Sequence, residues 1–141
     1  MVVELLIPDF RGEHSCLDTI IASGAHVIGH NLETVARLQG SVRDRRATYE
    51  QSLGVLKYIK EKSPSTYTKS ALMLGLGERE EEVLEAMDAM RSVGVDFITI
   101  GQYLQPTPKH LKVKEFIRPE KFEYYAQKAR EKGFIYAAAG P

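Results

Sequence analysis

The chain has 141 residues, of which 43% are hydrophobic and 27% charged, and its 19 basic side chains balance its 19 acidic ones. These values are typical of one soluble globular domain and argue against a nucleic-acid-binding protein, which usually carries a basic surface. No apolar run approaches the roughly 18 residues of a membrane span, and the apolar N-terminus lacks the basic region of a signal peptide. We therefore expect neither a nucleic-acid nor a membrane partner.

The sequence contains a single cysteine, Cys16. One thiol cannot form an internal disulfide, and it cannot build a zinc or iron–sulfur site alone. Cys16 lies at helical spacing from Ile20, so we predict a small core residue there. No metal ligand is predicted within this chain.

Apolar and β-branched runs alternate with amphipathic stretches along the chain. In order, the first half predicts a strand at 2–10, a helix at 15–24 capped by Ser15, a strand at 25–31, a helix at 32–39, a basic loop at 40–47 and a helix at 48–62. The second half predicts a strand at 67–74, a helix at 79–93, a strand at 95–104, a long polar connection at 105–119, a helix at 120–132 and a strand at 134–140.

This alternation predicts an α/β fold of right-handed βαβ units, in which a parallel sheet is covered by helices. Five strands are too few for a closed eight-stranded barrel. In such sheets ligands bind beyond the carboxyl ends of the strands. The polar residues at those ends are the candidates for a binding site: His30, Asn31, Glu33, Lys69, Ser70, Glu78, Gln102, Tyr103 and Gln105.

The turn Gly75-Leu76-Gly77-Glu78 links a predicted strand to a predicted helix. A dinucleotide fingerprint requires a third glycine where this chain has Glu80. The acids that follow the turn favour the helix dipole but repel a pyrophosphate. The turn therefore suits a neutral or cationic group, or close approach by a flat ring, and the alternative is a tight turn with no ligand.

Other candidates also have a structural alternative. Asn31 can cap the predicted helix at 32–39, with Glu33 in its first turn. Lys69 lies in an apolar strand, so it either extends to solvent or finds an anion. Strand alternation sends Gln102 and Tyr103 to opposite faces, and core packing alone can explain Tyr103.

Several strings nonetheless resemble, in order and at family spacing, the lipoyl synthase family of radical S-adenosylmethionine enzymes. They are PDFRG, HNLET, TKSALMLGLGE, GVDFITIGQYLQPTPKHL and the terminal AAAGP. No single string is specific, but the set covers essentially the whole chain. The resemblance implies a partial parallel (βα)6 barrel of radical S-adenosylmethionine type, with about four to five of its strands present.

The resemblance also implies an activity. Such a sulfurtransferase inserts sulfur at C6 and C8 of an octanoyl group carried on a lysine of a lipoyl carrier protein or lipoyl domain, giving lipoyl-lysine. The family uses S-adenosylmethionine and two 4Fe–4S clusters, one to generate a radical and one to donate sulfur. The implied compartment is the cytoplasm of a bacterium, or the mitochondrion if the host is eukaryotic.

The matching positions imply roles for the strand-end residues. His30, Asn31 and Glu33 would lie near the adenosine part of the cofactor, and Lys69 with Ser70 near its methionine part. The remaining implied cofactor-binding residues are Gly75, Gly77, Glu78, Gln102 and Tyr103, while Gln105 would face the substrate. No catalytic residue is implied within this chain.

The chain also departs from the family pattern. The CxxxCxxC motif of the radical-generating cluster and the cysteines of the auxiliary cluster are absent, and Cys16 matches none of them. We expect residues 1–141 to be the C-terminal part of a single barrel domain, truncated at both ends and inactive alone. An uncovered edge strand predicts association or poor solubility. The alternative is a non-catalytic module that binds S-adenosylmethionine or the carrier protein.

Overall fold

A sheet of five parallel strands forms the centre of the structure, a computed structural model that describes residues 1–141. The strands are β1 (Glu4–Leu6), β2 (Val27–Gly29), β3 (Tyr67–Leu74), β4 (Phe97–Gln102) and β5 (Tyr136–Gly140). Neighbours in the sheet follow the order of the chain, β1-β2-β3-β4-β5, and every pair is parallel. The predicted α/β class and parallel sheet are confirmed.

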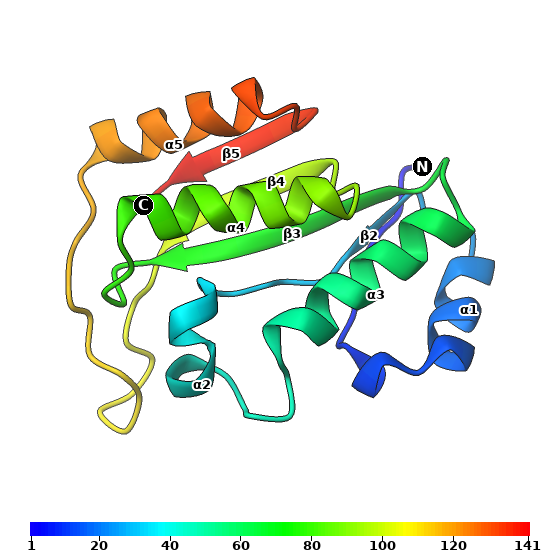
Figure 1. Cartoon of the computed structure of the whole chain (residues 1–141), viewed down its shortest axis with the longest axis horizontal. Coiled ribbons are helices and arrows are strands. Elements are labelled where there is room, and N and C mark those ends of the chain that lie inside the picture. The colour runs from blue at the N-terminus through cyan, green and yellow to red at the C-terminus, as the bar shows by residue number, and fades with distance from the viewer.

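Helices connect the strands. They are α1 (His14–Ala22), α2 (Gln39–Val42), α3 (Tyr49–Lys62), α4 (Glu80–Ser92) and α5 (Pro119–Glu131), with short 3-10 turns at Phe10–Gly12 and Ala36–Leu38. Because strand order equals chain order, right-handed crossovers put these helices on one face of the sheet. Figure 1 shows α3 and α4 in front of that face. One covered and one open face are consistent with a partial βα barrel.

The hydrophobic core lies between the sheet and its helices. In β3 the side chains alternate, so that Thr68, Ser70, Leu72 and Leu74 are buried while the residues between them are partly exposed. Leu72 and Leu74 belong to a core cluster with Met87 and Met90 of α4 and Phe122 of α5. The alternation follows from the period of two along a strand.

The opposite face of the sheet has no helix on it. Phe97 of β4 stacks on Tyr67 of β3 with ring centroids 5.0 Å apart, and it meets Tyr136 of β5 edge to face at 6.3 Å. Leu6 of β1 is 68% exposed. The chain therefore presents an apolar sheet face and an edge strand, β1, to solvent.

The long elements are confirmed to within about two residues at each end, with larger deviations in the short ones. The predicted strand at 2–10 shortens to Glu4–Leu6. Ser15 is not a cap, because α1 begins at His14 and Glu13 takes the N-cap position. Part of the predicted loop at 40–47 is helical, since α2 extends to Val42.

The helix predicted at 32–39 was wrong in its first half, since only residues 36–39 are helical. Residues 30–35 form an extended loop, and helical geometry begins only at Ala36. The backbone of Glu33 pairs with β3 as an isolated parallel bridge to Leu72, and its φ of 71° lies in the left-handed region. A helix cannot accommodate that backbone, so neither Asn31 nor Glu33 has the helix-cap role considered for it.

Cys16 is not a core residue. It lies half-buried on α1, and its Sγ is 4.0 Å from a carboxylate oxygen of Glu13. None of the helices in the structure has the length and apolar character needed to cross a membrane.

Candidate functional site

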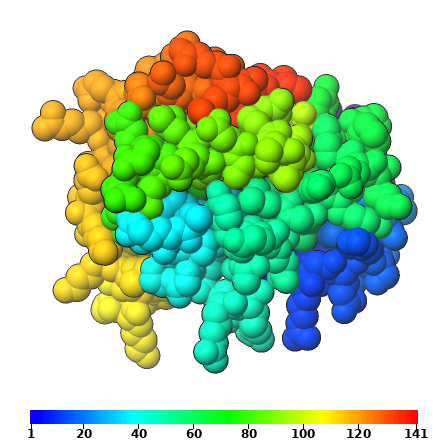
Figure 2. Space-filling model, viewed as in Figure 1, coloured from blue at the N-terminus to red at the C-terminus, as the bar shows by residue number.

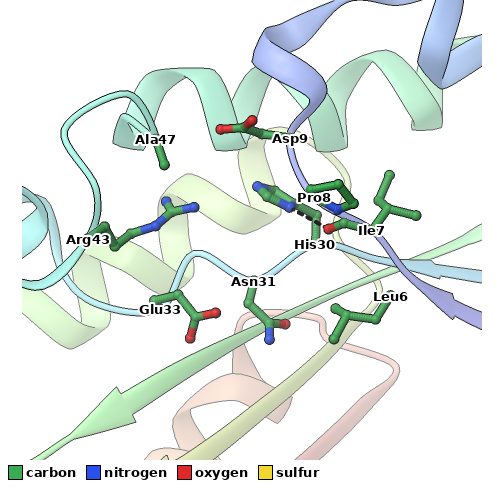
Figure 3. A pocket seen from close by; sticks show the side chains of 9 residues that line it. All are labelled: Leu6, Ile7, Pro8, Asp9, His30, Asn31, Glu33, Arg43 and Ala47. Atoms are coloured by element: carbon green, nitrogen blue, oxygen red, sulfur yellow. Dashed lines mark hydrogen bonds between the residues drawn. The ribbon is translucent and has the colours of Figure 1, made fainter.

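Two adjoining clefts lie at the carboxyl ends of the strands and share Asn31 and Glu33. The first, about 450 Å³, lies between the end of β1 and the loop after β2, and Figure 3 shows its lining side chains. The second, about 560 Å³, extends across the open face over the ends of β3, β4 and β5. This is the edge where the sequence placed its candidates, and the loop at 30–35 forms the boundary between the clefts.

Hydrogen bonds from two elements, β3 and α2, fix the loop at 30–35. The Leu32 amide donates to Ser70 Oγ of β3 at 3.0 Å. The Gln39 amide group of α2 donates to the carbonyls of Leu32 (2.9 Å) and Thr34 (2.7 Å). Ser70 and Gln39 are buried, so the Leu32 amide and the Leu32 and Thr34 carbonyls are satisfied without water.

Glu33 is held most firmly within this loop. Its amide donates to the Ala71 carbonyl at 3.0 Å, and its carbonyl accepts from the Met73 amide at 2.8 Å. A non-glycine residue in the left-handed region costs about 1–3 kcal/mol and persists only where its surroundings enforce it, and such residues cluster at binding sites. Here the bridge to β3 enforces the conformation and places the carboxylate between the clefts.

Burial raises the pKa of Glu33, although the Arg43 guanidinium and the Asn31 amide act in the opposite direction. Desolvation disfavours the ionised form of this half-buried carboxylate, because a negative charge is poorly solvated there. The carboxylate therefore has a strong tendency to accept hydrogen bonds or to meet a cation in the cleft.

His30 is a buried part of a hydrogen-bond chain beneath the first cleft. Its Nδ1 is 3.0 Å from the Ile7 carbonyl, and its Nε2 is 2.8 Å from Ser52 Oγ. Arg43 Nη1 donates to the same Ser52 oxygen at 2.9 Å.

The hydrogen-bond partners of His30 fix its tautomer. The Ile7 carbonyl only accepts, so Nδ1 carries the proton, and Nε2 then accepts from the Ser52 hydroxyl. Burial lowers the pKa of His30, which agrees with a neutral ring. His30 therefore positions the β2 end against β1 and does not present a free nitrogen to the first cleft.

Asp9 and Arg43 supply opposite charges at the other side of the first cleft. Burial alone would raise the pKa of Asp9, but hydrogen bonds from the Arg11 amide and the Gln51 side chain outweigh it, so this pKa is lowered. Arg43 also donates to Gln39 Oε1 at 3.1 Å. Sequence reasoning did not identify Asp9, Gln39, Arg43 or Ser52 as residues of the site.

The glycine turn after β3 is closed by its own residues. Glu78 accepts from the amides of Gly75 (2.7 Å) and Leu76 (3.0 Å). Gly75 has a φ of 103°, and a Cβ there would overlap Gln102 Nε2 and the Glu115 carbonyl. The space beside Gly75 is therefore filled by Gln102 and by the backbone of Glu115.

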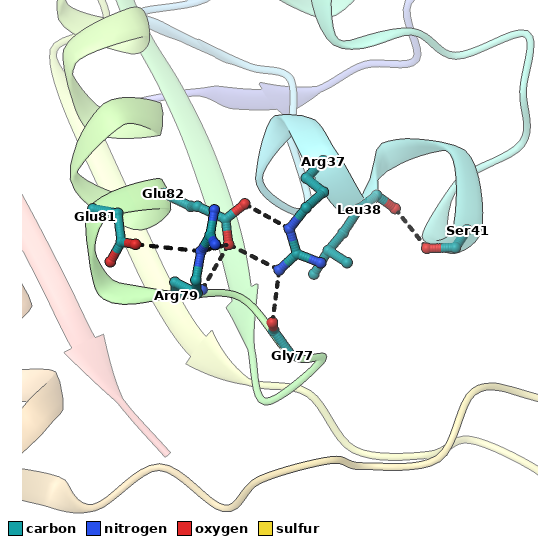
Figure 4. A network of polar contacts seen from close by, with 7 residues as sticks. All are labelled: Arg37, Leu38, Ser41, Gly77, Arg79, Glu81 and Glu82. Carbon is teal, nitrogen blue, oxygen red and sulfur yellow. Dashed lines mark hydrogen bonds and ion pairs between the residues drawn. The ribbon is translucent and has the colours of Figure 1, made fainter.

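The acids behind the turn also have partners. Arg37 donates from Nε to Glu82 Oε2 at 2.8 Å and from Nη2 to the Gly77 carbonyl at 2.9 Å, as Figure 4 shows. The Arg37 hydrogen bond lowers the pKa of Glu82 to about 2. Glu80 pairs with Lys121 of α5. This acidic cluster therefore joins α4 to Arg37 and to α5. Sequence reasoning missed Arg37.

Lys69 and Ser70 point to opposite faces of β3. Lys69 lies on the open face, where its Nζ is 2.8 Å from Glu4 Oε1, so the anion considered for it is a residue of β1. Ser70 is fully buried on the helix-covered face. Ser70 therefore cannot touch a ligand on the open face and acts on the site only by holding Leu32.

Three candidates at the end of β4, namely Gln102, Tyr103 and Gln105, form hydrogen bonds with the connection at 105–118. Gln102 lines the second cleft, and its side chain bonds the Glu115 carbonyl (3.0 Å) and the Ile117 amide (2.9 Å). Tyr103 is buried and donates to the Leu111 carbonyl at 2.8 Å. Gln105 donates to the His110 carbonyl at 3.0 Å. The structure thus brings Gln102 together with Asn31 and Glu33, whereas Tyr103 and Gln105 line neither cleft.

The residues present do not fit an iron–sulfur cluster. No group of three or more His, Cys, Asp or Glu side chains is placed to hold a metal ion, and Cys16 lies on α1 beside Glu13. Such clusters require several thiolate ligands. The carboxylate, amide and backbone groups of the two clefts suit a polar organic ligand instead.

Comparison with curated proteins finds close relatives. The mitochondrial lipoyl synthase of Aedes aegypti is 53% identical over 139 residues, which cover 99% of this chain and 35% of that protein. Those of Trichoplax adhaerens and Xenopus laevis are 51% and 50% identical over 141 residues, covering 40% and 38% of the relatives. No protein-family model matches. The chain therefore spans between 35% and 40% of the length of these relatives.

Proposed function

We propose that this chain, which is homologous over its whole length to one segment of lipoyl synthases, supplies the S-adenosylmethionine-binding edge of such an enzyme. The observation that carries the proposal is the pair of clefts that share Asn31 and Glu33 at the carboxyl ends of a singly wound parallel sheet. The barrel would be of radical S-adenosylmethionine type, with residues 1–141 as the C-terminal part of one domain.

The donors and acceptors of the second cleft suit the cofactor. S-adenosylmethionine carries a cationic sulfonium, an ammonium, ribose hydroxyls and an adenine amino group. Asn31 and Glu33 provide amide and carboxylate groups there, and Thr99 and Met73 add a hydroxyl and an apolar surface. The Gln102 side chain is already engaged by Glu115 and Ile117, so Gln102 contributes the end of the β4 backbone. A volume of about 560 Å³ lies within the range of small-molecule sites, about 300–1,000 Å³.

The residues of this chain would bind and orient the cofactor. The Glu33 carboxylate would accept from the ribose hydroxyls or face the positive charge, and the bridge to β3 keeps that carboxylate in place. Ser70, Gln39 and His30 are positioning residues that act through the loop at 30–35 and the β2 end. In the whole enzyme the bound cofactor would supply the hydrogen-abstracting chemistry, and Asn31 and Glu33 of this chain would hold it.

The cluster ligands are not among these residues, so we expect the 141-residue chain alone to bind the cofactor without turnover. In the whole enzyme the reaction would be sulfur insertion at C6 and C8 of an octanoyl-lysine on a lipoyl carrier protein or lipoyl domain. The enzyme is then a sulfurtransferase with two 4Fe–4S clusters. The names of the relatives favour the mitochondrion as its compartment if the host is eukaryotic.

A non-catalytic module that binds S-adenosylmethionine or the carrier is the second candidate. Fragment complementation separates the two. The cluster-bearing remainder of the Xenopus laevis relative is reconstituted and mixed with this chain, octanoylated lipoyl domain, cofactor and reductant. Lipoyl product that depends on the chain supports the enzymatic function, and its absence despite cofactor binding supports the module.

The binding site itself is tested by NMR of the isotope-labelled chain with S-adenosylmethionine. We expect the largest amide shift changes at Asn31, Glu33 and Gln102, because these residues line the second cleft. Amides of α1, such as that of Asp18, serve as an internal control. Shift changes confined to the glycine turn or to α1 would contradict the proposed site.

A further inference from the structure

The connection between β4 and α5, residues 105–118, is an ordered strap although it contains no helix or strand. The Tyr103 hydroxyl holds the Leu111 carbonyl, and the Gln102 side chain holds both Glu115 and Ile117. The Lys114 amide donates to the Gly75 carbonyl at 2.8 Å. Anchors at intervals of a few residues fix the path of the strap before any partner arrives, which lowers the entropy cost of binding.

The outward side of the strap is basic. Lys109, Lys112 and Lys114 are all exposed, and none of them has an ion-pair partner in the structure. Of the other lysines only Lys62 also lacks one, whereas Lys57, Lys60, Lys69, Lys121, Lys128 and Lys132 are paired. The strap adds Arg118 and His110 and contains one acid, Glu115. In a chain with zero net charge, this is a local surplus of positive charge.

Exposed apolar side chains accompany the lysines. Phe116 is 70% exposed, Leu104 is 65% exposed and Leu111 is 45% exposed. A patch with apolar residues among charged ones is the composition of a protein–protein interface, in which the apolar part contributes affinity and the charges contribute orientation and association rate.

The strap also lies at the edge of the sheet that carries the site. It begins three residues after Gln102, the last residue of β4, which lines the second cleft and holds Glu115 and Ile117 through its side chain. In Figure 1 the strap runs from the end of β4 to the start of α5, and in Figure 2 its yellow and orange side chains form one outer edge of the molecule. A protein docked on the strap would therefore be close to the clefts.

We infer that the strap is the docking surface for an acidic face of the carrier domain that bears the octanoyl-lysine. The inference rests on the proposed function, since it names the surface by which that enzyme would meet its protein substrate. Negative charge on the carrier would meet Lys109, Lys112 and Lys114, and an apolar patch would meet Leu111 and Phe116. The modified lysine would then reach the clefts past Gln102.

The test is the affinity of this chain for an octanoylated lipoyl domain with an acidic surface, measured by fluorescence anisotropy. The variant Lys109→Glu/Lys112→Glu is expected to lose at least about tenfold in affinity at low salt, because like charges now face each other. The matched control is Lys57→Glu/Lys62→Glu on α3, which changes the net charge equally and should change the affinity less than about twofold. Raising the ionic strength from about 0.05 M to about 0.5 M should lower the affinity of the wild type and reduce the difference in affinity between the wild type and the variants.

A second variant tests the apolar part. Phe116→Ala should speed dissociation and leave the salt dependence unchanged, because it removes apolar contact without altering charge. Equal losses in the strap and α3 double variants, or no measurable binding by the wild type, would overturn the docking surface. Stronger binding to a duplex oligonucleotide than to the lipoyl domain would overturn it as well.

Cofactor binding in the same variants separates this inference from the proposed function. Lys109 and Lys112 line neither cleft, so S-adenosylmethionine affinity should be unchanged in the strap variant. Loss of carrier binding with intact cofactor binding is the result that supports the surface. A wild type that binds the carrier through the strap but binds no cofactor would contradict the proposed cofactor site and leave the docking surface standing.

Discussion

The Glu33 carbonyl accepts from the Met73 amide at 2.8 Å and its amide donates to the Ala71 carbonyl at 3.0 Å, so a single residue between β2 and α2 joins the β3 ladder at Leu72. The bridge carries its carboxylate to the boundary of two clefts. A binding group on a loop gains the rigidity of a strand by this arrangement.

The Ser52 hydroxyl connects Arg43 to His30, so its removal should destabilise the fold. Ser52→Ala leaves the buried His30 Nε2 without a hydrogen-bond donor, a loss of about 1–3 kcal/mol in the free energy of unfolding. Urea denaturation measures it. Ser15→Ala on the exposed side of α1 is the control and should change this free energy by less than about 0.5 kcal/mol. Equal effects of the two substitutions would contradict the hydrogen-bond chain.

His30 should also give the fold a characteristic pH dependence. Its pKa in the folded chain lies below the unfolded value of about 6.5, so the unfolded state takes up a proton first as the pH falls. The stabilisation is fully present above about pH 6.5 and is lost as the pH falls from there through the lowered folded pKa.

Urea midpoints between about pH 5 and pH 8 measure this dependence. In His30→Gln the decline of stability below about pH 6.5 should be reduced, because the titrating ring is gone. His110→Gln on the exposed strap should retain the full decline. If His30→Gln keeps the same slope as the wild type, the lowered pKa of His30 is not its source.

Residue 75 must be glycine, because Gln102 and the strap occupy the space that a side chain there would need. Gly75→Ala places a Cβ against Gln102 and the Glu115 carbonyl and strains a backbone with φ of 103°. We expect a loss of more than about 2 kcal/mol in the free energy of unfolding. Gly54→Ala, in the middle of α3 with open space around it, should instead gain about 0.5–1 kcal/mol. A neutral Gly75→Ala would show that the strap does not pack against the turn.

The side chain of Gln102 clamps the strap at Glu115 and Ile117, so Gln102→Ala should loosen it. Trypsin cleavage after Lys109, Lys112 and Lys114 should become several-fold faster, because proteases cut backbone that opens locally. Mass spectrometry of the digests gives the rates. Gln127→Ala on the exposed side of α5 is the control, and cleavage that is equally fast in both variants would exclude the clamp.

The regular elements were predictable because their patterns are local. Strand β3 alternates along all eight residues, and α3, α4 and α5 have apolar residues at helical spacing with glycine or proline at their ends. Strict alternation of strands and helices then allowed the parallel sheet to be predicted, and the polar residues after each strand marked the edge that carries the site.

The errors arise where a distant partner decides the local structure. LETVARLQ has the composition of a helix, but the bridge from Glu33 to Leu72 holds its first residues extended. Ser70 resembled a ligand contact, but alternation in β3 turns it to the buried face, where it holds Leu32. The contacts of Arg37, Arg43 and Ser52 join residues that are not adjacent in sequence, and composition carries little signal for such contacts.

The most direct test of the account is the affinity of the 141-residue chain for S-adenosylmethionine, measured by calorimetry for the wild type, Glu33→Gln and the exposed control Glu115→Gln. The account predicts binding by the wild type and the control, and a loss of at least about tenfold, or about 1.4 kcal/mol, in Glu33→Gln. It also predicts that wild-type affinity falls as the pH drops through the raised pKa of Glu33. Binding that is absent in the wild type, or unchanged in Glu33→Gln, would contradict the proposed cofactor site.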